Sequence, residues 1–505
     1  ALGLLVWFGL AALAASKLWE WVLTFDPGFA VREASASSGA ALTNSVTVLL
    51  VDGLRLDASR QMSTLNGLRS LGADVEVRVG TPSFSRPGRA TLAVGATQAV
   101  HGVTTNRQSR RIPLDNLFRR VGESGGRCRV AGSGIWPGLF GADIRLCGVY
   151  RAGEAKEGPG AFVRQVPEVR RADRAGIDFI LEGPARLRIA DIIATDFAAH
   201  EYGGASLEYA SEVERTDVLL GLLASRLDLT RETLVVTADH GHRDAGGHGG
   251  EEPAVLTVPV VMVGAGIRPG TRLRGAHEDV APTIATLLGL PLPASSTGEP
   301  FVGALAMDEA KAQAVRSATA AQRQSFLDDA ASRLQLSDRP ASFAAAISTY
   351  RDRSVASRAW PAAVVLTAFG LALLLMLRRG GVATLLGLGV VGLLVLGPVG
   401  SSWPPMSFSA INYDQMLLPY FRHIATLSAV TALCGLAASF LTAWRRAPGR
   451  PSPAETALAT SHVLSSVCAT VLVWLWWRFD LLDPMSLPGP DAMVWSWSGH
   501  SPPLS

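Results

Sequence analysis

Acidic and imidazole side chains follow several short apolar runs of this chain. Asp52 comes directly after the run Val46–Val51 (VTVLLV). The others are Asp196 and His200, which follow Asp191–Thr195 (DIIAT), and Asp239 and His240, which follow Thr233–Thr237 (TLVVT). One such Asp is more often a helix cap, but five of these residues at strand ends are the ligand inventory of a site for zinc or a similar divalent cation. The sequence therefore predicts a metal site, with His248 in the glycine-rich stretch AGGHGG as a further ligand.

A candidate nucleophile lies in the segment Thr81–Gly95 (TPSFSRPGRATLAVG). Ser85 stands before Pro87 and ahead of a stretch of small residues that favours a helix. Backbone N–H groups at the start of a helix can hold a phosphate oxygen. A plain helix N-cap serine is the competing interpretation, and Ser83 and Thr81 are alternative nucleophiles.

Strands and helices must position these residues. Short β-branched runs, including Val258–Val263 (VPVVMV), alternate with helical stretches such as Ser206–Leu227. This alternation predicts an α/β fold with a doubly wound, mainly parallel sheet. In such sheets ligands bind just beyond the carboxyl ends of the strands, where the candidate residues stand.

The composition indicates a second, membrane-embedded part. Only 18% of the 505 residues are charged, against roughly 25% in an average soluble protein, and the mean hydropathy is +0.25. Stretches near the spanning length of about 20 residues predict transmembrane helices. They are Leu2–Val22, Trp360–Leu377, Gly381–Val399, Ile424–Trp444 and Thr456–Trp477. A cleaved signal peptide competes with a retained anchor for the first stretch, and the flanking tryptophans favour the anchor.

Arginines between the spans predict the orientation. Arg378 and Arg379 separate the second and third spans, and Arg445, Arg446 and Arg450 separate the fourth and fifth. The positive-inside rule makes both loops cytoplasmic and puts the large segment between the first two spans outside. The predicted organisation is an anchor at 1–25, a linker at 26–45, a catalytic domain at 46–305, a helical connector at 306–358, four transmembrane helices at 359–480 and an extracytoplasmic tail at 481–505.

Charge and cysteine content narrow the function classes further. A net charge of +3 argues against a nucleic-acid partner, because such proteins carry a basic excess. Cys128 and Cys147 both lie in the outside domain, where an oxidising compartment permits a disulfide but the spacing does not decide it. His101 and His277 are expected to be core or turn residues rather than ligands.

The sequence segments around these residues resemble the alkaline phosphatase superfamily, and most closely the GPI ethanolamine phosphate transferases of the first-mannose type. The segments that carry the resemblance are VDGLRLD (Val51–Asp57), PSFSRPGRATLAVG (Pro82–Gly95), TDFAAHEYG (Thr195–Gly203), TADHGHRDAGGHGGEEPAVLTVPVVMVGAGI (Thr237–Ile267) and EDVAPTIATLLGLPLPASSTG (Glu278–Gly298). The Asp–x3–His and Asp–His–Gly elements mark the superfamily, and the SRPG turn points to the transferase branch.

The resemblance implies roles for individual residues. One zinc ion would be held by Asp52, Asp239 and His240 and would activate Ser85 as nucleophile. A second zinc ion would be held by the remaining ligands, which are Asp196, His200 and His248. Substrate contacts are expected from Asn106, Arg89 and His242; His242 stands where the family often has Met, and a surface position is the simpler interpretation for it.

The implied activity is a membrane-anchored phosphoethanolamine-type transferase. Its donor would be a phospholipid such as phosphatidylethanolamine, its intermediate a phospho-serine, and its acceptor a glycan or lipid hydroxyl. A phosphodiesterase or phosphatase of the same superfamily is the alternative, with a sulfatase less favoured although Ser85 and Arg89 fit the pattern S-x-P-x-R. A scaffold with a degenerate site is disfavoured because every expected ligand is present. The chain has no Asn-x-Ser/Thr site, which fits a bacterial periplasm better than a eukaryotic ER lumen.

Overall fold

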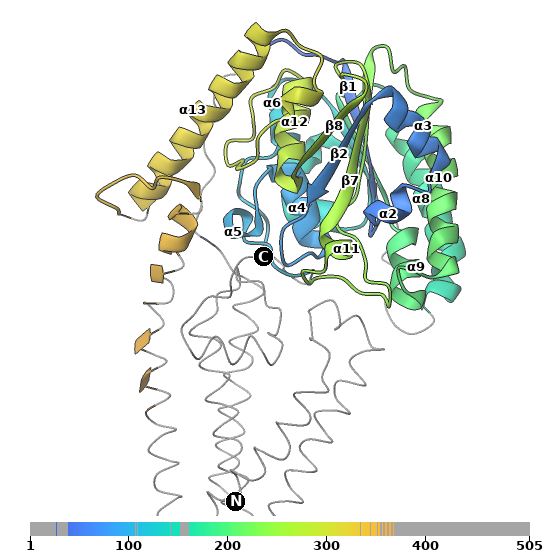
Figure 1. Cartoon of the computed structure of the whole chain (residues 1–505), viewed down its shortest axis with the longest axis horizontal. Helices are drawn as coiled ribbons and strands as arrows, with labels where there is room; N and C mark the ends of the chain where they lie inside the picture. Colours follow the sequence, from blue (N-terminus) through green and yellow to red (C-terminus); the bar gives the residue numbers. More distant parts are fainter. Residues whose placement is uncertain are drawn as a thin grey trace, which may run out of the picture. The chain divides into compact units, whose positions relative to one another are not determined.

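The computed structural model describes residues 39–350 apart from 107, 109, 142, 152–160, 334 and 344, together with Pro27 and scattered residues from 352 to 367. Nearly all of them, from Gly39 to Ser348, belong to one compact unit (Figure 1). The five predicted spans and the predicted tail fall almost wholly outside the described residues. Within the described part, none of the helices combines the length and the apolar character that crossing a membrane requires.

One eight-stranded sheet organises the described domain. Its strands are β1 (Ser45–Val51), β2 (Ala73–Arg78), β3 (Cys128–Gly132), β4 (Cys147–Arg151), β5 (Leu187–Ile192), β6 (Glu232–Thr237), β7 (Thr257–Gly264) and β8 (Thr271–Ala276). They lie in the order β4-β3-β5-β1-β6-β7-β2-β8, and all neighbours are parallel except β7, which is antiparallel to β6 and to β2. The mainly parallel sheet of an α/β fold that the sequence predicted is confirmed, and the antiparallel β7 makes it a mixed sheet.

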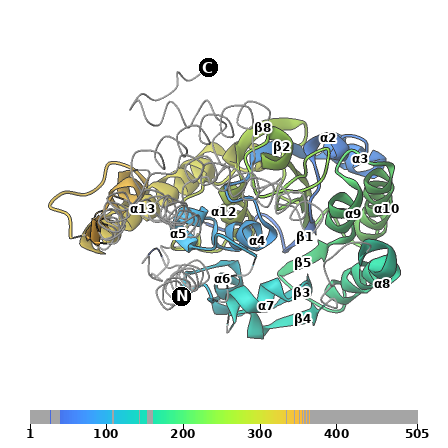
Figure 2. The ribbon, with the colours of Figure 1, turned by 90° about the horizontal axis from the view of Figure 1, so that it is seen from below.

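Helices cover both faces of this sheet (Figures 1 and 2). One layer contains α3 (Ser63–Leu71), α8 (Ala161–Ile180), α9 (Ala194–Tyr202) and α10 (Leu207–Ala224). The other contains α4 (Ser85–Val94), α6 (Leu117–Glu123), α7 (Ile135–Phe140) and α12 (Val280–Leu287). Short helices α2 (Leu56–Ser59), α5 (Gln98–His101) and α11 (Pro253–Leu256) and the turns η1 (Asp143–Leu146), η2 (His277–Asp279) and η3 (Val302–Ala304) complete the fold, and α13 (Glu309–Arg333) follows it.

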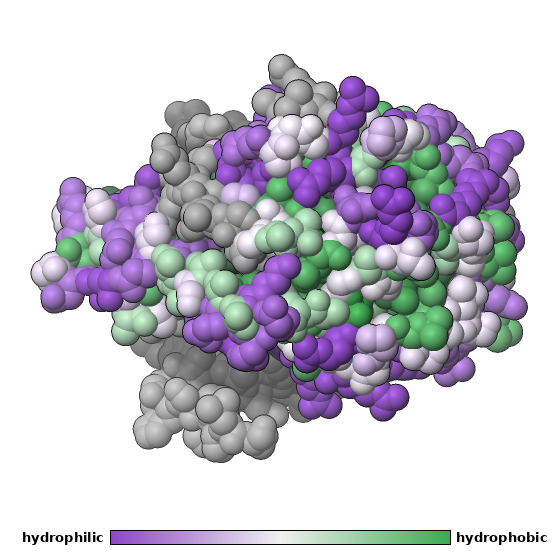
Figure 3. Space-filling view, turned by 90° about the horizontal axis from the view of Figure 1, so that it is seen from above, coloured by the Kyte–Doolittle hydropathy of each residue, from purple (hydrophilic) through white to green (hydrophobic). Residues whose placement is uncertain are grey.

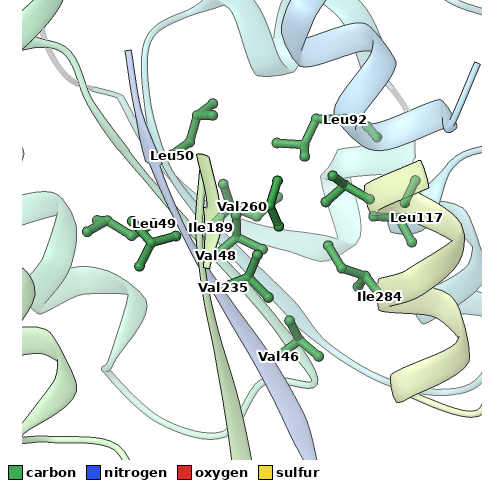
Figure 4. Packing of buried hydrophobic residues seen from close by; sticks show 14 of the residues in the cluster. Val46, Val48, Leu49, Leu50, Leu92, Leu117, Ile189, Val235, Val260 and Ile284 are labelled. Carbon is green, nitrogen blue, oxygen red and sulfur yellow. The ribbon is translucent and has the colours of Figure 1, made fainter. Parts of the chain in front are cut away.

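The hydrophobic core lies between the sheet and these layers. β1 is buried along its whole length, as expected for a parallel strand that is covered on both faces. Val48 and Val235 lie on the side of α4, α6 and α12, whereas Leu49 points to the opposite side (Figure 4). Because successive strand residues face opposite sides of a sheet, one apolar run serves both core layers and holds the carboxyl end of β1 in place.

The predicted strand Asp191–Thr195 is wrong in its boundaries. β5 spans Leu187–Ile192, and α9 begins at Ala194. Asp191 is therefore a buried strand residue paired with Leu50 of β1. Asp196 and His200 lie one helical turn apart on α9, so a helix rather than a strand end positions them. The apolar run DIIAT continues into the first turn of the helix, and its hydropathy alone does not mark this change.

The two cysteines of the domain are joined. β3 and β4 pair in parallel with Cys128 opposite Cys147, and their Cα atoms are 4.5 Å apart. The structure links them by a disulfide, which answers the question that their spacing left open. The bond ties the edge strand β4 to the sheet.

The end of the domain at the top of Figure 1 carries both polar and apolar residues. Figure 3 views it from above relative to Figure 1, and hydrophilic and hydrophobic residues are interspersed there. The projection at the left of this view, formed by α13 and the segment after it, is mainly hydrophilic. Polar surface of this kind fits a solvated domain.

Candidate functional site

The candidate residues converge at one end of the sheet. β5, β1 and β6 are parallel neighbours, so the residues that follow them leave the sheet at the same edge. Asp52 follows β1, Asp239 and His240 follow β6, and Asp196 is in the first turn of α9 just beyond β5. All four are nine-tenths or more buried, which makes this a built interior site.

The first group comprises Asp52, Asp239 and His240, whose ligand atoms lie within 4.8 Å of one another. His240 Nε2 is 3.3 Å from Asp52 Oδ1 and 3.7 Å from Asp239 Oδ2. Asp52 Oδ1 is buried and has no hydrogen-bond partner in the described part of the chain. A buried carboxylate oxygen without a donor is costly, and a cation at this point would satisfy it.

The second group comprises Asp196, His200 and His248, with His242 beside them. His200 Nε2 is 3.4 Å from Asp196 Oδ1 and 3.1 Å from His248 Nε2, and His248 Nε2 is 3.7 Å from Asp196 Oδ1. Three ligand atoms of three side chains thus face one point. The two groups touch, because the rings of His240 and His248 stack with centroids 3.6 Å apart.

Both groups fit a tetrahedral divalent ion. Zinc–nitrogen and zinc–oxygen bonds of about 2.0–2.1 Å place neighbouring tetrahedral ligands about 3.3 Å apart. The distances above, from 3.1 to 3.7 Å, scatter around this value. The geometry and the donor types therefore match one divalent ion in each group.

Ser85 lies beside the first group. It is the first residue of α4, and its Oγ is 3.1 Å from His240 Nε2, the same spacing as between the candidate ligands. The side chain is 6% exposed. Ser83, the alternative nucleophile, instead donates to Gly250 O and accepts from Gly249 N, so it supports the loop that carries His248. The geometry favours Ser85 as the reacting hydroxyl.

His242 differs from the surface residue that the sequence suggested. Its side chain is fully buried, and its Nε2 is 2.7 Å from Asp196 Oδ1. This separation is shorter than a tetrahedral ligand–ligand distance and fits an N–H donating to a carboxylate. We interpret His242 as the residue that orients Asp196. The sequence concealed this role because the surrounding glycine-rich stretch reads as an exposed loop.

Arg89, which was expected to contact the substrate, is instead buried among three carboxylates. Its guanidinium has no exposed surface and donates to Asp52, Asp239 and Asp191 at 2.6, 2.6 and 2.8 Å. Arg89 thus fixes one ligand carboxylate from each of two strands. Asp191, which sequence reasoning missed, completes this network and also accepts from Trp136 Nε1. The available signal was a charged residue inside an otherwise apolar strand.

Asn106 lies at the start of the nucleophile helix. Its Oδ1 accepts from the backbone N–H of Arg86 at 2.8 Å, and its carbonyl oxygen accepts from Arg86 Nε at 3.0 Å. Asn106 therefore holds the residue that follows Ser85 at two points. The two predicted core histidines are both buried: His101 pairs with Thr91 Oγ1, and His277 lies in η2.

Burial dominates the electrostatics of the site. It raises the pKa of Asp239 to about 7 and holds the pKa of Asp52 well above its usual range, against the opposing effect of Arg89. Burial likewise lowers the pKa values of His240 and His248 far below normal. Neutral imidazole is the form that binds a metal, and a bound cation would favour the ionised carboxylates.

Comparisons with known proteins agree with this chemistry. Residues 163–292 match the Metalloenzyme superfamily. The human GPI ethanolamine phosphate transferase 3 catalytic subunit is 24% identical over 298 residues, covering 52% of this chain and 26% of that protein. The 2,3-bisphosphoglycerate-independent phosphoglycerate mutase of Paracoccus denitrificans is 33% identical over 160 residues, covering 29% and 32%. The matched part thus spans less than a third of each relative.

Among solved structures, murine ectonucleotide pyrophosphatase/phosphodiesterase 5 superposes with a TM-score of 0.39 at 15% identity, covering 49% of this chain and 96% of that one. The two metal-ligand groups and the match over residues 163–292 lead to one assignment. Residues 163–292 carry a domain of the metalloenzyme superfamily, the alkaline phosphatase-like group.

Proposed function

We propose that this protein is a membrane-anchored, metal-dependent transferase that moves a phosphoethanolamine-type head group from a phospholipid to a hydroxyl of a glycan or lipid. The observation that carries the proposal is the position of Ser85 beside the Asp52–Asp239–His240 group, with its Oγ 3.1 Å from His240 Nε2. A serine in this position fits transfer through a covalent intermediate. The similarity to GPI ethanolamine phosphate transferases supports the choice of head group.

In this proposal, some residues of the chain would hold the metal ions and others would orient the ligands. Two divalent ions, which we propose to be zinc, would supply Lewis-acid stabilisation of the attacking and leaving oxygens. Asp52, Asp239 and His240 would hold one ion, and the second group would hold the other, while Arg89 and His242 keep the ligand carboxylates in place. The N-terminus of α4 contributes its helix dipole at Ser85, where negative charge would develop on the phosphoryl oxygens. The N–H of Arg86 already donates to Asn106 Oδ1, that of Gly88 donates to Phe84 O, and Pro87 has none.

The reaction would proceed in two balanced displacements. In the first, Ser85 Oγ forms a bond to phosphorus and gives up its proton, while the bond to the diacylglycerol oxygen breaks and that oxygen takes up a proton. In the second, the acceptor oxygen bonds to phosphorus, loses its proton, and the Ser85 ester bond breaks with return of a proton to Ser85. Phosphatidylethanolamine is the proposed donor.

The proposed site of action is outside the cytoplasm. The apolar stretches that flank the domain and the arginines between them support an extracytoplasmic domain on the membrane surface, in the periplasm if the source is bacterial. Because donor and leaving group are both lipids, anchoring would keep the site at its substrate.

The test is to incubate the purified full chain with phosphatidylethanolamine labelled in its head group. We expect label on the wild-type protein and on an acceptor lipid extract, and loss of both with Ser85→Ala or with a chelator. Ser70→Ala, at a surface serine of α3 that donates to Gly67 O, is the matched control. Absence of label from both the protein and the extract would contradict the proposal.

Hydrolysis is the second candidate, because the same Ser85 and metal groups serve it when water replaces the acceptor. Zinc-dependent turnover of a nitrophenyl phosphodiester that needs no acceptor would assign the protein to the phosphodiesterases. Turnover of a sulfate ester would assign it to the sulfatases. Arg89 occupies the S-x-P-x-R position but is committed to three carboxylates, which gives the sulfatase no added support.

A further inference from the structure

Two arginines beside the nucleophile helix lack a counter-charge. Arg86 follows Ser85 directly, and apart from its contacts with Asn106 it makes no hydrogen bond or ion pair in the described part of the chain. Arg111 likewise has none there. The other two arginines near the ligands behave differently, since Arg55 pairs with Asp57 and Asp244, and Arg89 is surrounded by carboxylates.

Both unpaired guanidiniums lie along α7. A Cβ added at Gly138 would be 3.3 Å from Arg86 Nη1, and one added at Gly141 would be 2.8 Å from Arg111 Cδ and 3.0 Å from its Nε. Gly138 lies within α7 and Gly141 directly follows its last residue, so the arginines contact neighbouring positions at the end of this helix. The absence of side chains at 138 and 141 leaves room for both arginines against the helix.

The chain fixes this arrangement at several points. Asn106 accepts from the backbone and from Nε of Arg86, and Ile112 N donates to Leu139 O at 2.8 Å. Asn106 is therefore held against Arg86 and Ile112 against α7, and Arg111 directly precedes Ile112. Arg86 is half-buried, and its Nη groups are not among the buried unpaired atoms. Because they also have no hydrogen-bond partner in the described part of the chain, they keep some solvent access.

An unpaired pair of cations favours an anion. Burial and the neighbouring Arg89 lower the pKa of Arg86, and its hydrogen bonds within the described part go to Asn106 rather than to a carboxylate. Guanidinium groups bind carboxylate and phosphate through paired hydrogen bonds, and these bonds strengthen where water is partly excluded. The metal-ligand groups lie on the β1 and β6 side of Ser85, whereas Arg86 and Arg111 lie on the α7 side.

We infer that Arg86 and Arg111 form an anion-binding subsite, and that the natural substrates include one that bears a second anionic group, a phosphate or a carboxylate, next to the phosphodiester or hydroxyl that reacts. This inference rests on the proposed function and specifies its substrate class. A neutral alkyl chain or a cationic group on the α7 side would leave both charges uncompensated.

The test uses two synthetic diesters of equal length, 4-nitrophenyl pentyl phosphate and 4-nitrophenyl 4-carboxybutyl phosphate, with the full chain loaded with zinc and with glycerol supplied as the acceptor hydroxyl. We expect kcat/KM to favour the carboxylate by about tenfold, equivalent to one well-made ionic contact of about 1.4 kcal/mol. Arg86→Met and Arg111→Met should each reduce this ratio toward one. Arg272→Met is the matched control, because Arg272 is an exposed arginine on β8 without a hydrogen bond or ion pair in the described part of the chain, and it should leave the ratio unchanged.

A binding measurement tests the anion-binding subsite separately from the proposed transferase function. In Ser85→Ala protein, calorimetric titration with methyl 4-carboxybutyl phosphate and with methyl pentyl phosphate compares the affinities for the same two alkyl groups without turnover. Tighter binding of the carboxylate that disappears with Arg86→Met supports the subsite, even if no diester is turned over and the proposed function fails. Equal affinities for the two ligands, or a ratio of affinities that Arg86→Met leaves unchanged, would overturn the subsite while leaving the transferase proposal in place.

Discussion

At the scale of single residues, the site depends on partners of the ligands as much as on the ligands. Arg89 links Asp52 and Asp239 through one guanidinium, and His242 bonds to Asp196. Such outer contacts fix the orientation of metal-binding side chains and are as important for affinity as several of the ligands. The site is thus organised before any ion binds.

His242 provides a test of this organisation. His242→Phe removes the N–H that orients Asp196, and we expect zinc affinity to fall by about tenfold or more. His242→Gln keeps an N–H donor of similar reach and should retain most of the affinity. Competition with a coloured chelator measures both. Equal affinity of the Phe variant and the wild type would show that His242 does not orient the ligand.

At the scale of elements, close approach of α4 to β6 places Ser85 against the metal groups. Gly88 allows this approach, because a Cβ at this position would lie 2.7 Å from Asp239 Cβ and 2.8 Å from Asp239 O. The packing of α4 against Asp239 therefore also sets the position of a candidate metal ligand.

Gly88→Ala should separate the helix from Asp239. We expect the free energy of unfolding to fall by about 1–3 kcal/mol, as for overpacked interiors, with loss of zinc binding. Gly67→Ala is the control: it lies in α3 with no atom within 4 Å of an added Cβ, and it should stabilise the helix by about 0.5–1 kcal/mol. Urea unfolding followed by tryptophan fluorescence measures both variants, and a Gly88→Ala protein as stable as the wild type would contradict the close contact.

At the scale of the whole molecule, buried neutral histidines make stability depend on pH. Burial lowers the pKa of His277 to about 4 and that of His101 to about 3, from a usual 6.5. Because the folded-state pKa values are depressed, the unfolded chain binds protons that the native chain does not once the pH falls below about 6.5. Their contribution to stability is complete above that pH and is lost on acidification through the folded values.

His277→Phe should reduce this acid sensitivity. Both ring nitrogens of His277 are buried without a partner in the described part of the chain, so an apolar ring removes the titration without breaking a hydrogen bond. Between pH 6 and 4.5 we expect the free energy of unfolding of the wild type to fall about 1.4 kcal/mol per pH unit more steeply than that of the variant. Urea unfolding in a chelator measures the slopes, and parallel slopes would exclude His277 as a source.

The sequence by itself determined the ligand types, the mainly parallel sheet and the superfamily, because each depends on local signals. Apolar runs followed by Asp or His are visible within a few residues, and a buried parallel strand has a continuous hydrophobic pattern. The predicted spans and their orientation rest on the same kind of signal and remain predictions.

Only the tertiary structure decided which residues meet. Arg89 and His242 were expected at the substrate, yet packing buries both against carboxylates that are distant in sequence. The boundary of β5, the role of Asp191 and the pairing of Cys128 with Cys147 depended in the same way on strand register. Composition and spacing carry no information about register between distant segments, because that register is set by how side chains fill the space between the sheet and its helices.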